Sequence, residues 1–340
     1  MTALEDRDSV IQLIGGYIVS NAIRAAGDFG IFSLLDVDDG LTLTEVALGA
    51  RIDEAHLIRL LRTLQQAHLV EEAGNRFHLT SPGRLLVPER EGTLANFARN
   101  FTSPLFQRSW DSLEETLRTG TPGFFLVNQQ SIYDYFAEDD AANALFNGAM
   151  QEEAAATATA ATTIITLAEN ERVIDLGGGD GTFLTKLLQA NPTATGTVFD
   201  SPAGIANAPS VIDRSSVANR CDFQAGDFFT AIPRNGTTYI LKSVLQDWDD
   251  ERAYQILRTC AEQVPAGARL IIIGNFIPDD FDRNAAVGYL TDMCMLVISG
   301  GRERTLDDLR RLLDRAGLPT ASLSHRRVGP LTAVELTSAP

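Results

Sequence analysis

The stretch ERVIDLGGGDGTFL, residues 171–184, decides how the rest of the chain is interpreted. Residues 172–176 have the apolar character of a short buried strand, and a turn of three glycines, residues 177–179, follows it. A helix is predicted to open at about Thr182. A strand that turns through glycines into a helix brings bare backbone, and the N–H groups of a first helical turn, against a ligand.

The acids around this turn indicate which nucleotide it binds. The glycine spacing is G-x-G-x-G, because Thr182 stands where dinucleotide folds place their third glycine. Asp175 and Asp180 suit an ammonium group or a ribose hydroxyl better than a pyrophosphate. The next predicted strand, residues 195–200, ends in Asp200, roughly twenty residues on, where a ribose-binding acid is expected. Together these features favour S-adenosylmethionine (SAM) over NAD as the cofactor.

Composition and charge limit the class of protein. The 340 residues leave room for two domains and a sizeable core. The net charge of -17 argues against a nucleic-acid partner. No apolar run approaches the roughly eighteen residues of a membrane span, and the acidic N-terminus is no signal peptide. Three cysteines without a CxxC pair (Cys221, Cys260 and Cys294) suit a reducing compartment, so we expect a cytoplasmic protein without membrane contact.

Residues 1–100 are predicted to form a helical dimerisation and winged-helix domain. Apolar residues recur at helical spacing over residues 10–35, which indicates a dimer surface or, equally, a core helix. A capping box at Thr42 and Glu45 opens a helix, and Asp53 is expected to cap the next one. A hairpin is predicted over residues 69–79.

The winged-helix order raises DNA binding as an alternative. The helix that would read DNA, residues 54–66, offers Arg59 and Arg62 beside Glu54, and the whole chain is acidic. Because DNA binding depends on clustered positive charge, we regard this alternative as a minor one.

Residues 101–168 are predicted to be a helical linker and the roof of a substrate pocket. Helical patterns break at residues 103–104 and 120–123, and one long helical tract covers residues 131–167. Phe146 and Met150 lie on this tract. Such residues are more often core than ligand wall, but a helix that enters a nucleotide domain is well placed to cover its pocket.

Residues 169–340 alternate between strands and helices. This alternation predicts an α/β fold with a doubly wound, mostly parallel sheet, whose ligand lies at the carboxyl ends of the strands. Gly177, Asp200, Asp227 and Gln246 all fall at or just past such ends. The further predicted strands are residues 221–227, 239–245, 269–274, 321–326 and 331–336, and the further helices are residues 249–264, 285–298 and 305–316.

Five stretches give the chain a family resemblance: VIDLGGGDGTFL, VFDSP, GDFF, LKSVLQDWDDERAYQIL and MCMLVISGGRERT. Over nearly its whole length the chain resembles the SAM-dependent O-methyltransferases of the caffeate and hydroxyindole type and their bacterial relatives in secondary metabolism. The resemblance implies a Rossmann-like class I methyltransferase domain behind a winged-helix dimerisation domain. It also implies a homodimer and a small-molecule substrate.

The resemblance carries roles over to individual residues. Asp175 and Gly177 would hold the amino-acid part of SAM, and Asp200 would take the ribose hydroxyls. The remaining cofactor residues it implies are Gly179, Ser201, Asp227 and Phe228, the last two bracketing the adenine, and Lys242 beside the cofactor. The substrate would meet Phe146, Met150, Asp292 and Met293.

Two departures from the family pattern concern catalysis. Gln246 stands where the family has its general base, a histidine directly before Asp-Trp, and Gly274 stands where an acid orients that histidine. Of the family's catalytic trio, Glu303 remains. Glutamine can hydrogen-bond a substrate, but it cannot take its proton. The four histidines offer no replacement, because they lie in or beside the winged helix or in a late strand: His56, His68, His78 and His325.

Three hypotheses follow. Alignment supplies much of the rate of methyl transfer, so we favour a SAM-dependent methyltransferase without the histidine base. Gln246 would position, and Glu303 would assist, a phenol acidified by a neighbouring carbonyl, a neutral amine or an enolisable carbon. The alternative is a related enzyme that keeps SAM but catalyses a pericyclic reaction, a cyclisation or a hydroxylation, with Gln246 polarising a carbonyl. The weakest is a SAM-responsive regulator. The aromatic and methionine content suggests a mid-sized natural product as substrate.

Overall fold

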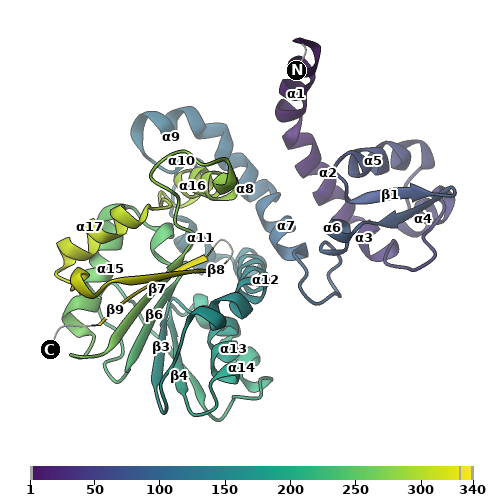
Figure 1. Ribbon diagram of the computed structural model, residues 1–340. Coiled ribbons are helices and arrows are strands. Elements are labelled where there is room, and N and C mark those ends of the chain that lie inside the picture. Colours follow the sequence, from purple (N-terminus) through teal and green to yellow (C-terminus); the bar gives the residue numbers. More distant parts are fainter. Residues whose placement is uncertain (1–2, 329–330, 338–340) are drawn as a thin grey trace. The chain divides into compact units, whose positions relative to one another are not determined.

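The computed structural model describes residues 3–328 and 331–337 (Figure 1). The chain forms two compact units. One comprises residues 1–107 together with 148–153, and the other comprises residues 108–147 and 154–340.

The N-terminal unit has the predicted winged-helix order. The Thr42 hydroxyl accepts from Glu45 N, and the Glu45 carboxylate accepts from Thr42 N at 2.7 Å, which confirms the capping box. Asp53 caps the next helix through Ala55 N at 2.9 Å. Its elements are α1 (Ala3–Ile14), α2 (Gly16–Asp28), α3 (Ile31–Leu34), α4 (Leu43–Ala50), α5 (Glu54–Gln66), β1 (Val70–Ala73), β2 (Arg76–Leu79), α6 (Ser81–Arg84) and α7 (Ala95–Phe101).

The predicted hairpin and a single core hold this unit together. Gly74 and Asn75 both have positive φ, as a two-residue hairpin turn between β1 and β2 requires. Leucines at helical spacing on α5 are fully buried, and they pack in the same core as residues of the β1–β2 hairpin. The core includes Ala26, Ile31, Leu57, Leu61, Leu64, Val70 and Phe77.

The prediction of one long helix over residues 131–167 is wrong at Asp139. This residue leaves the helical conformation, with φ -122 and ψ 95, and its carboxylate accepts from Ala141 N and Ala142 N. An aspartate that can cap a helix thus separates two helices. The helices of this region are α8 (Pro104–Ser109), η1 (Trp110–Ser112), α9 (Leu113–Thr119), α10 (Gly123–Asn128), α11 (Ile132–Glu138) and α12 (Asp140–Ile164).

A doubly wound sheet forms the centre of the second unit, as predicted. Among the described residues it has seven strands in the order β5-β4-β3-β6-β7-β9-β8, and the pairings among the first five are parallel. The last two strands pair antiparallel. The strands are β3 (Arg172–Leu176), β4 (Thr195–Asp200), β5 (Cys221–Ala225), β6 (Thr238–Lys242), β7 (Arg269–Gly274), β8 (Ser324–Val328) and β9 (Leu331–Thr337).

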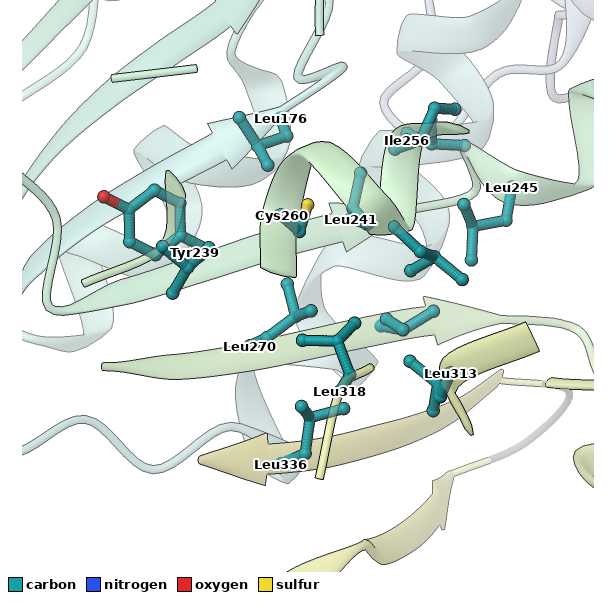
Figure 2. Packing of buried hydrophobic residues seen from close by; sticks show 14 of the residues in the cluster. Leu176, Tyr239, Leu241, Leu245, Ile256, Cys260, Leu270, Leu313, Leu318 and Leu336 are labelled. Atoms are coloured by element: carbon teal, nitrogen blue, oxygen red, sulfur yellow. The ribbon is translucent and has the colours of Figure 1, made fainter. Parts of the chain in front are cut away.

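Successive residues of the strands point to opposite faces of this sheet, so both faces are packed (Figure 1). Val173 packs with α12 and α13, whereas Ile174 packs with α15 and α17. Figure 2 shows the cluster that contains Ile174. In it, the side chains of Leu241 on β6 and Leu270 on β7 pack between the sheet and helices α15 and α17. The remaining helices are α13 (Thr182–Ala190), η2 (Gly204–Asn207), α14 (Ala208–Asp213), η3 (Leu245–Asp247), α15 (Asp250–Gln263), η4 (Arg283–Ala285), α16 (Ala286–Ile298), α17 (Leu306–Ala316) and η5 (Thr320–Ser322).

Strand β6 ends three residues earlier than its apolar sequence predicts. Ser243 takes a left-handed conformation with φ 56, and its N–H donates to Ile273 O at 2.8 Å. A non-glycine residue in this region costs about 1–3 kcal/mol and is typical of functional sites. The turn starts η3, which holds Gln246 at the carboxyl edge of the sheet.

Candidate active site

The glycine turn after β3 is shaped for close approach of a ligand. Gly177 has φ 73, and a Cβ on it would lie 2.6 Å from Val244 Cγ2, so a side chain is excluded. Its N–H donates to Phe199 O at 2.7 Å, which ties the turn to β4. Gly179 also has positive φ, and no described heavy atom lies within 4 Å of its Cβ position. The backbone at Gly179 is therefore accessible to a ligand.

Asp200 fixes this turn from the end of β4. Its Oδ2 accepts the Gly179 N–H at 2.9 Å, and its Oδ1 accepts the Ser201 N–H at 2.6 Å. The Ser201 hydroxyl in turn accepts the Gly204 N–H at 3.1 Å. Burial raises the pKa of Asp200, while these backbone donors oppose the rise. The carboxylate thus lies beside the glycine backbone and fixes its conformation.

Asp175 lies beneath the turn and is 1 % exposed. Within the described part of the chain, its Oδ2 has no hydrogen-bond partner. Burial raises its pKa to about 7, Lys242 opposes the rise, and Asp200 adds to it. A buried carboxyl oxygen without a donor is expected to meet one from a ligand, and an ammonium group would supply it. The residues therefore fit the amino-acid end of SAM.

Asp227 and Phe228 follow β5 at the same edge. Asp227 is exposed, and its Oδ1 accepts the Phe229 N–H at 2.9 Å. The half-buried Phe228 ring reaches to 3.6 Å from the Cβ position of Gly177. Its ring packs edge-on against Phe229, with centroids 4.9 Å apart. An apolar ring therefore lies beside the glycine turn, as adenine binding would need.

The turn that carries Gln246 is held by Arg304, which is 4 % exposed. The guanidinium donates to Leu245 O at 2.5 Å and to Trp248 O at 2.9 Å, and it pairs with Asp250 at 2.9 Å. These bonds fix the backbone on both sides of Gln246.

Gly301 allows the loop before Arg304 to pack directly on this turn. A Cβ on Gly301 would lie 2.0 Å from Gln246 O and 2.5 Å from the Asp247 carbonyl carbon. A side chain at this position is therefore incompatible with the observed packing. The GGRERT stretch thus positions the turn and brings Glu303 to it.

Glu303 is 4 % exposed, and among the described groups its Oε1 lacks a hydrogen-bond partner. Its own N–H donates to Asp292 Oδ1 at 2.8 Å. Burial raises the pKa of Glu303 to about 8, Asp247 and Asp292 add to the rise, and Arg304 opposes it. Its deprotonated form is therefore an unusually strong base for a carboxylate.

Gln246 and Glu303 line one small cavity at the ends of β6 and β7. Gly274 also lines it, and the Cβ position of Gly274 lies 3.8 Å from Gln246 Oε1. The structure therefore brings together the two predicted catalytic residues and Gly274, the position at which the family resemblance predicts an orienting acid. The cavity is lined by Leu245, Gln246, Ile272, Ile273, Gly274, Asn275, Phe276, Arg302, Glu303, Arg304 and Leu309.

The predicted substrate residues do not line this cavity and lie in other parts of the structure. Phe146 on α12 stacks on Phe136, with centroids 4.5 Å apart. Asp292 and Met293 are half-buried on α16, and Asp292 holds the Glu303 backbone. Met150 is half-buried in the segment that belongs to the N-terminal unit. None of these four is among the described residues that line the cavity.

Sequence reasoning missed a pair beside Gln246. The Tyr133 hydroxyl hydrogen-bonds to the Asp247 carboxylate, and burial raises the pKa of Asp247 to about 7. The Tyr133 ring stacks on Trp248, with centroids 5.0 Å apart. Asp247 could have been singled out as an acid adjoining Gln246. Tyr133 carries no comparable signal, because only the fold brings α11 to this turn.

The sheet order, the glycine turn and the acids at its edge define a class I methyltransferase domain. Residues 110–319 match the family described as the O-methyltransferase domain, and residues 11–89 match the O-methyltransferase dimerisation domain. The chain therefore belongs to the O-methyltransferase family. The predicted fold class, the methyltransferase activity and SAM as cofactor are confirmed.

Methyltransferases of bacterial secondary metabolism resemble nearly the whole chain. O-demethylpuromycin-O-methyltransferase of Streptomyces alboniger is 36% identical over 92% of this chain and 84% of its own length. The mitomycin biosynthesis 6-O-methyltransferase of Streptomyces lavendulae is 30% identical over 98% and 95%. The structure of CalO1, a methyltransferase in calicheamicin biosynthesis with S-adenosylhomocysteine bound, superimposes with a TM-score of 0.84 at 26% identity over 100% of both chains.

One expected absence can be examined in the structure. No helix in residues 3–328 or 331–337 is long and apolar enough to cross a membrane.

Proposed function

We propose that the protein transfers a methyl group from SAM to an acidic phenol, or a comparable protic nucleophile, of a small, partly aromatic natural product. Gln246 positions the acceptor, and Glu303 assists its deprotonation. The observation that carries this proposal is that Gln246 and the buried Glu303, with its unpaired Oε1, line the same cavity.

The cofactor residues take the roles that their surroundings support. Asp175 would receive the ammonium group of SAM, because its buried Oδ2 needs a donor. Asp200, with Ser201 beside it, would meet the ribose hydroxyls, and Asp227 and Phe228 would bracket the adenine. The bound cofactor supplies an electrophilic methyl group on a sulfonium. Gly177 and Gly179 leave its binding surface free of side chains. Lys242 would balance the charge of Asp175, whose pKa it lowers.

The chain's own residues can support this transfer without a histidine. Gln246 can donate a hydrogen bond from its amide Nε2 to the acceptor oxygen, which orients the nucleophile for in-line attack. Glu303 can hold the released proton. The relatives described above are named methyltransferases, and nothing in the comparisons supports the non-methylating alternative. Phe146, Met150, Asp292 and Met293 remain candidates for contact with the parts of the substrate outside the cavity.

We further propose a homodimer. Exposed apolar side chains gather on α1 and α2, and Leu13 is 81 % exposed. The dimerisation-domain match, residues 11–89, covers this surface from Ile11 onward. The charge of -17 disfavours nucleic acid as a partner, and the free thiols of the described chain fit the reducing cytoplasm. The exposed apolar residues are Val10, Ile11, Leu13, Ile14, Tyr17 and Ile18.

The test is mass spectrometry of the purified protein incubated with SAM and acceptors. O-demethylpuromycin, the acceptor named for a relative, and a series of phenols with neighbouring carbonyls are the probes. S-adenosylhomocysteine should rise in step with a product heavier by one methylene unit. Gln246→Ala should raise the acceptor KM, whereas Gln255→Ala on the exposed side of α15 should behave as the wild type. Conversion of a probe without S-adenosylhomocysteine would instead establish a non-methylating enzyme.

A further inference from the structure

We propose that the cavity beside Gly274 is a water site through which the acceptor's proton reaches the carboxylate of Glu303, with the Gln246 side chain holding the water. The proposal rests on the methyltransferase function proposed above. In this proposal the space beside Gly274, where the family resemblance predicts an orienting acid, forms part of the proton path.

A Cβ at Gly274 would clash with no neighbouring atom. The nearest described atoms to its Cβ position are Phe276 Cε2 at 3.7 Å and Gln246 Oε1 at 3.8 Å, which are ordinary contact distances. A cavity retains water when it is polar and offers two to four hydrogen-bonding groups. Gln246, Asn275 and Glu303 supply such groups to this cavity. Its surroundings therefore suit an ordered water next to Gln246 Oε1.

The deprotonated form of Glu303 needs a donor that the neighbouring side chains do not provide. Arg304, the adjacent cation, directs its guanidinium to Leu245 O, Trp248 O and Asp250. Arg302 pairs with Asp250 and Asp308. Both arginines that line the cavity are thus engaged with other acceptors, and Glu303 Oε1 is left without a partner among the described residues. A water in the cavity would satisfy this oxygen.

The transfer balances in atoms and charge. The acceptor hydroxyl gives its proton to the water while the water gives one of its own to Glu303, which becomes a neutral carboxylic acid. The acceptor oxygen uses the released electron pair to bond the methyl carbon, and the carbon–sulfur bond breaks with its electrons on sulfur. Asp247 and Asp292 strengthen Glu303 as a base, Arg304 weakens it, and burial leaves its pKa at about 8. This value lies near that of an acidified phenol.

Crystallography tests the water site directly. A high-resolution structure with S-adenosylhomocysteine bound should show a water about 2.6–3.2 Å from both the Gln246 and the Glu303 side chains. In Gly274→Leu, the leucine should displace this water, whereas Gly274→Ala should retain it. A cavity without such a water in the wild type would overturn the proposal whatever the enzyme's activity.

Kinetics tests the proton path. With a phenol that the wild type methylates, Glu303→Gln should slow single-turnover methyl transfer about 100-fold, in line with the usual worth of a general base. The dissociation constant for SAM should stay unchanged, and Gly274→Leu should slow transfer more than Gly274→Ala. The matched control is Glu262→Gln, which alters an exposed carboxylate paired with Arg258.

Two failures can be told apart. Methyl transfer by Glu303→Gln within threefold of the wild type would overturn the proton path and leave the methyltransferase function standing. Failure of the wild type to form S-adenosylhomocysteine with any probe would count against the proposed function, and the crystallographic test would still decide the water site.

Discussion

Gln246 Oε1 lies 3.8 Å from the point where Gly274 would carry a Cβ. A residue with a side chain at position 274 would therefore lie beside residue 246, at ordinary contact distance from the nearest atoms. This spacing is compatible with the histidine and orienting acid that the family resemblance predicts at these two positions.

The double variant Gln246→His with Gly274→Glu should therefore recover a conventional base. Because general-base assistance is worth about 10²–10⁴-fold, we expect the double variant to transfer methyl groups to weakly acidic phenols at least tenfold faster than either single variant. Its rate should rise with pH near the ordinary pKa of histidine, about 6.5. Stopped-flow measurements over a pH series would show this. Equal rates in the double and single variants would mean that the two positions are not aligned for proton transfer.

Asp200→Ala should weaken SAM binding. The carboxylate holds the Gly179 N–H at 2.9 Å and lies where the ribose is expected. Hydrogen bonds to charged groups contribute about 1.5–3 kcal/mol, so the dissociation constant should rise about 10–100-fold. Isothermal titration calorimetry with SAM measures this directly. Asp213→Ala, at the exposed end of α14, is the control, and an equal loss in both variants would contradict a ribose role for Asp200.

Gly301→Ala should disturb the turn that carries Gln246. The added Cβ would lie 2.0 Å from Gln246 O, and such overpacking typically costs about 1–3 kcal/mol. We expect a lower melting temperature and a loss of methyl transfer with little change in SAM affinity. Gly27→Ala, at a helical position with no described atom within 4 Å, should leave methyl transfer and SAM affinity unchanged and should not lower the melting temperature. Wild-type turnover in Gly301→Ala would show that the loop can move without moving Gln246.

Asp175→Asn should change how the stability of the cofactor-free protein depends on pH. Burial raises the pKa of Asp175 from 3.8 to about 7. Because the unfolded chain loses this proton first, Asp175 contributes stability at low pH that is lost as pH rises from about 4 to 7. The variant lacks this loss, so its melting temperature relative to the wild type should increase with pH over that window and then level off. Thermal melts from pH 4 to 8 test this, and a constant difference would contradict the raised pKa.

The parts of the fold that the sequence predicted well depend on local chemistry. The capping box at Thr42, the strand before Gly177 and the acid at Asp200 each follow from residues close together in the chain. The early end of β6 could not be predicted, because the apolar run continues past Ser243 and only tertiary packing imposes its left-handed backbone. The interruption at Asp139 was missed because the helical pattern resumes directly after it.

The candidate catalytic residues could be singled out from the sequence, but their surroundings could not. Gln246, Gly274 and Glu303 stand out against the family pattern. Arg304 donates hydrogen bonds to the turn that carries Gln246, and the Tyr133 hydroxyl hydrogen-bonds to Asp247. Both interactions join segments that are distant in sequence. The unpaired Oε1 of Glu303, on which the proposed proton transfer depends, is visible only once those segments are packed together.

The most direct test of methyl transfer without a histidine base is to quantify S-adenosylhomocysteine and methylated product together, for the wild type, Gln246→Ala and Glu303→Gln. The wild type should form both in equal amounts. Gln246→Ala should need more acceptor to reach half of its maximal rate, and Glu303→Gln should be slow at every acceptor concentration. Product formed without S-adenosylhomocysteine, or full activity in both variants, would contradict the proposed roles of these two residues.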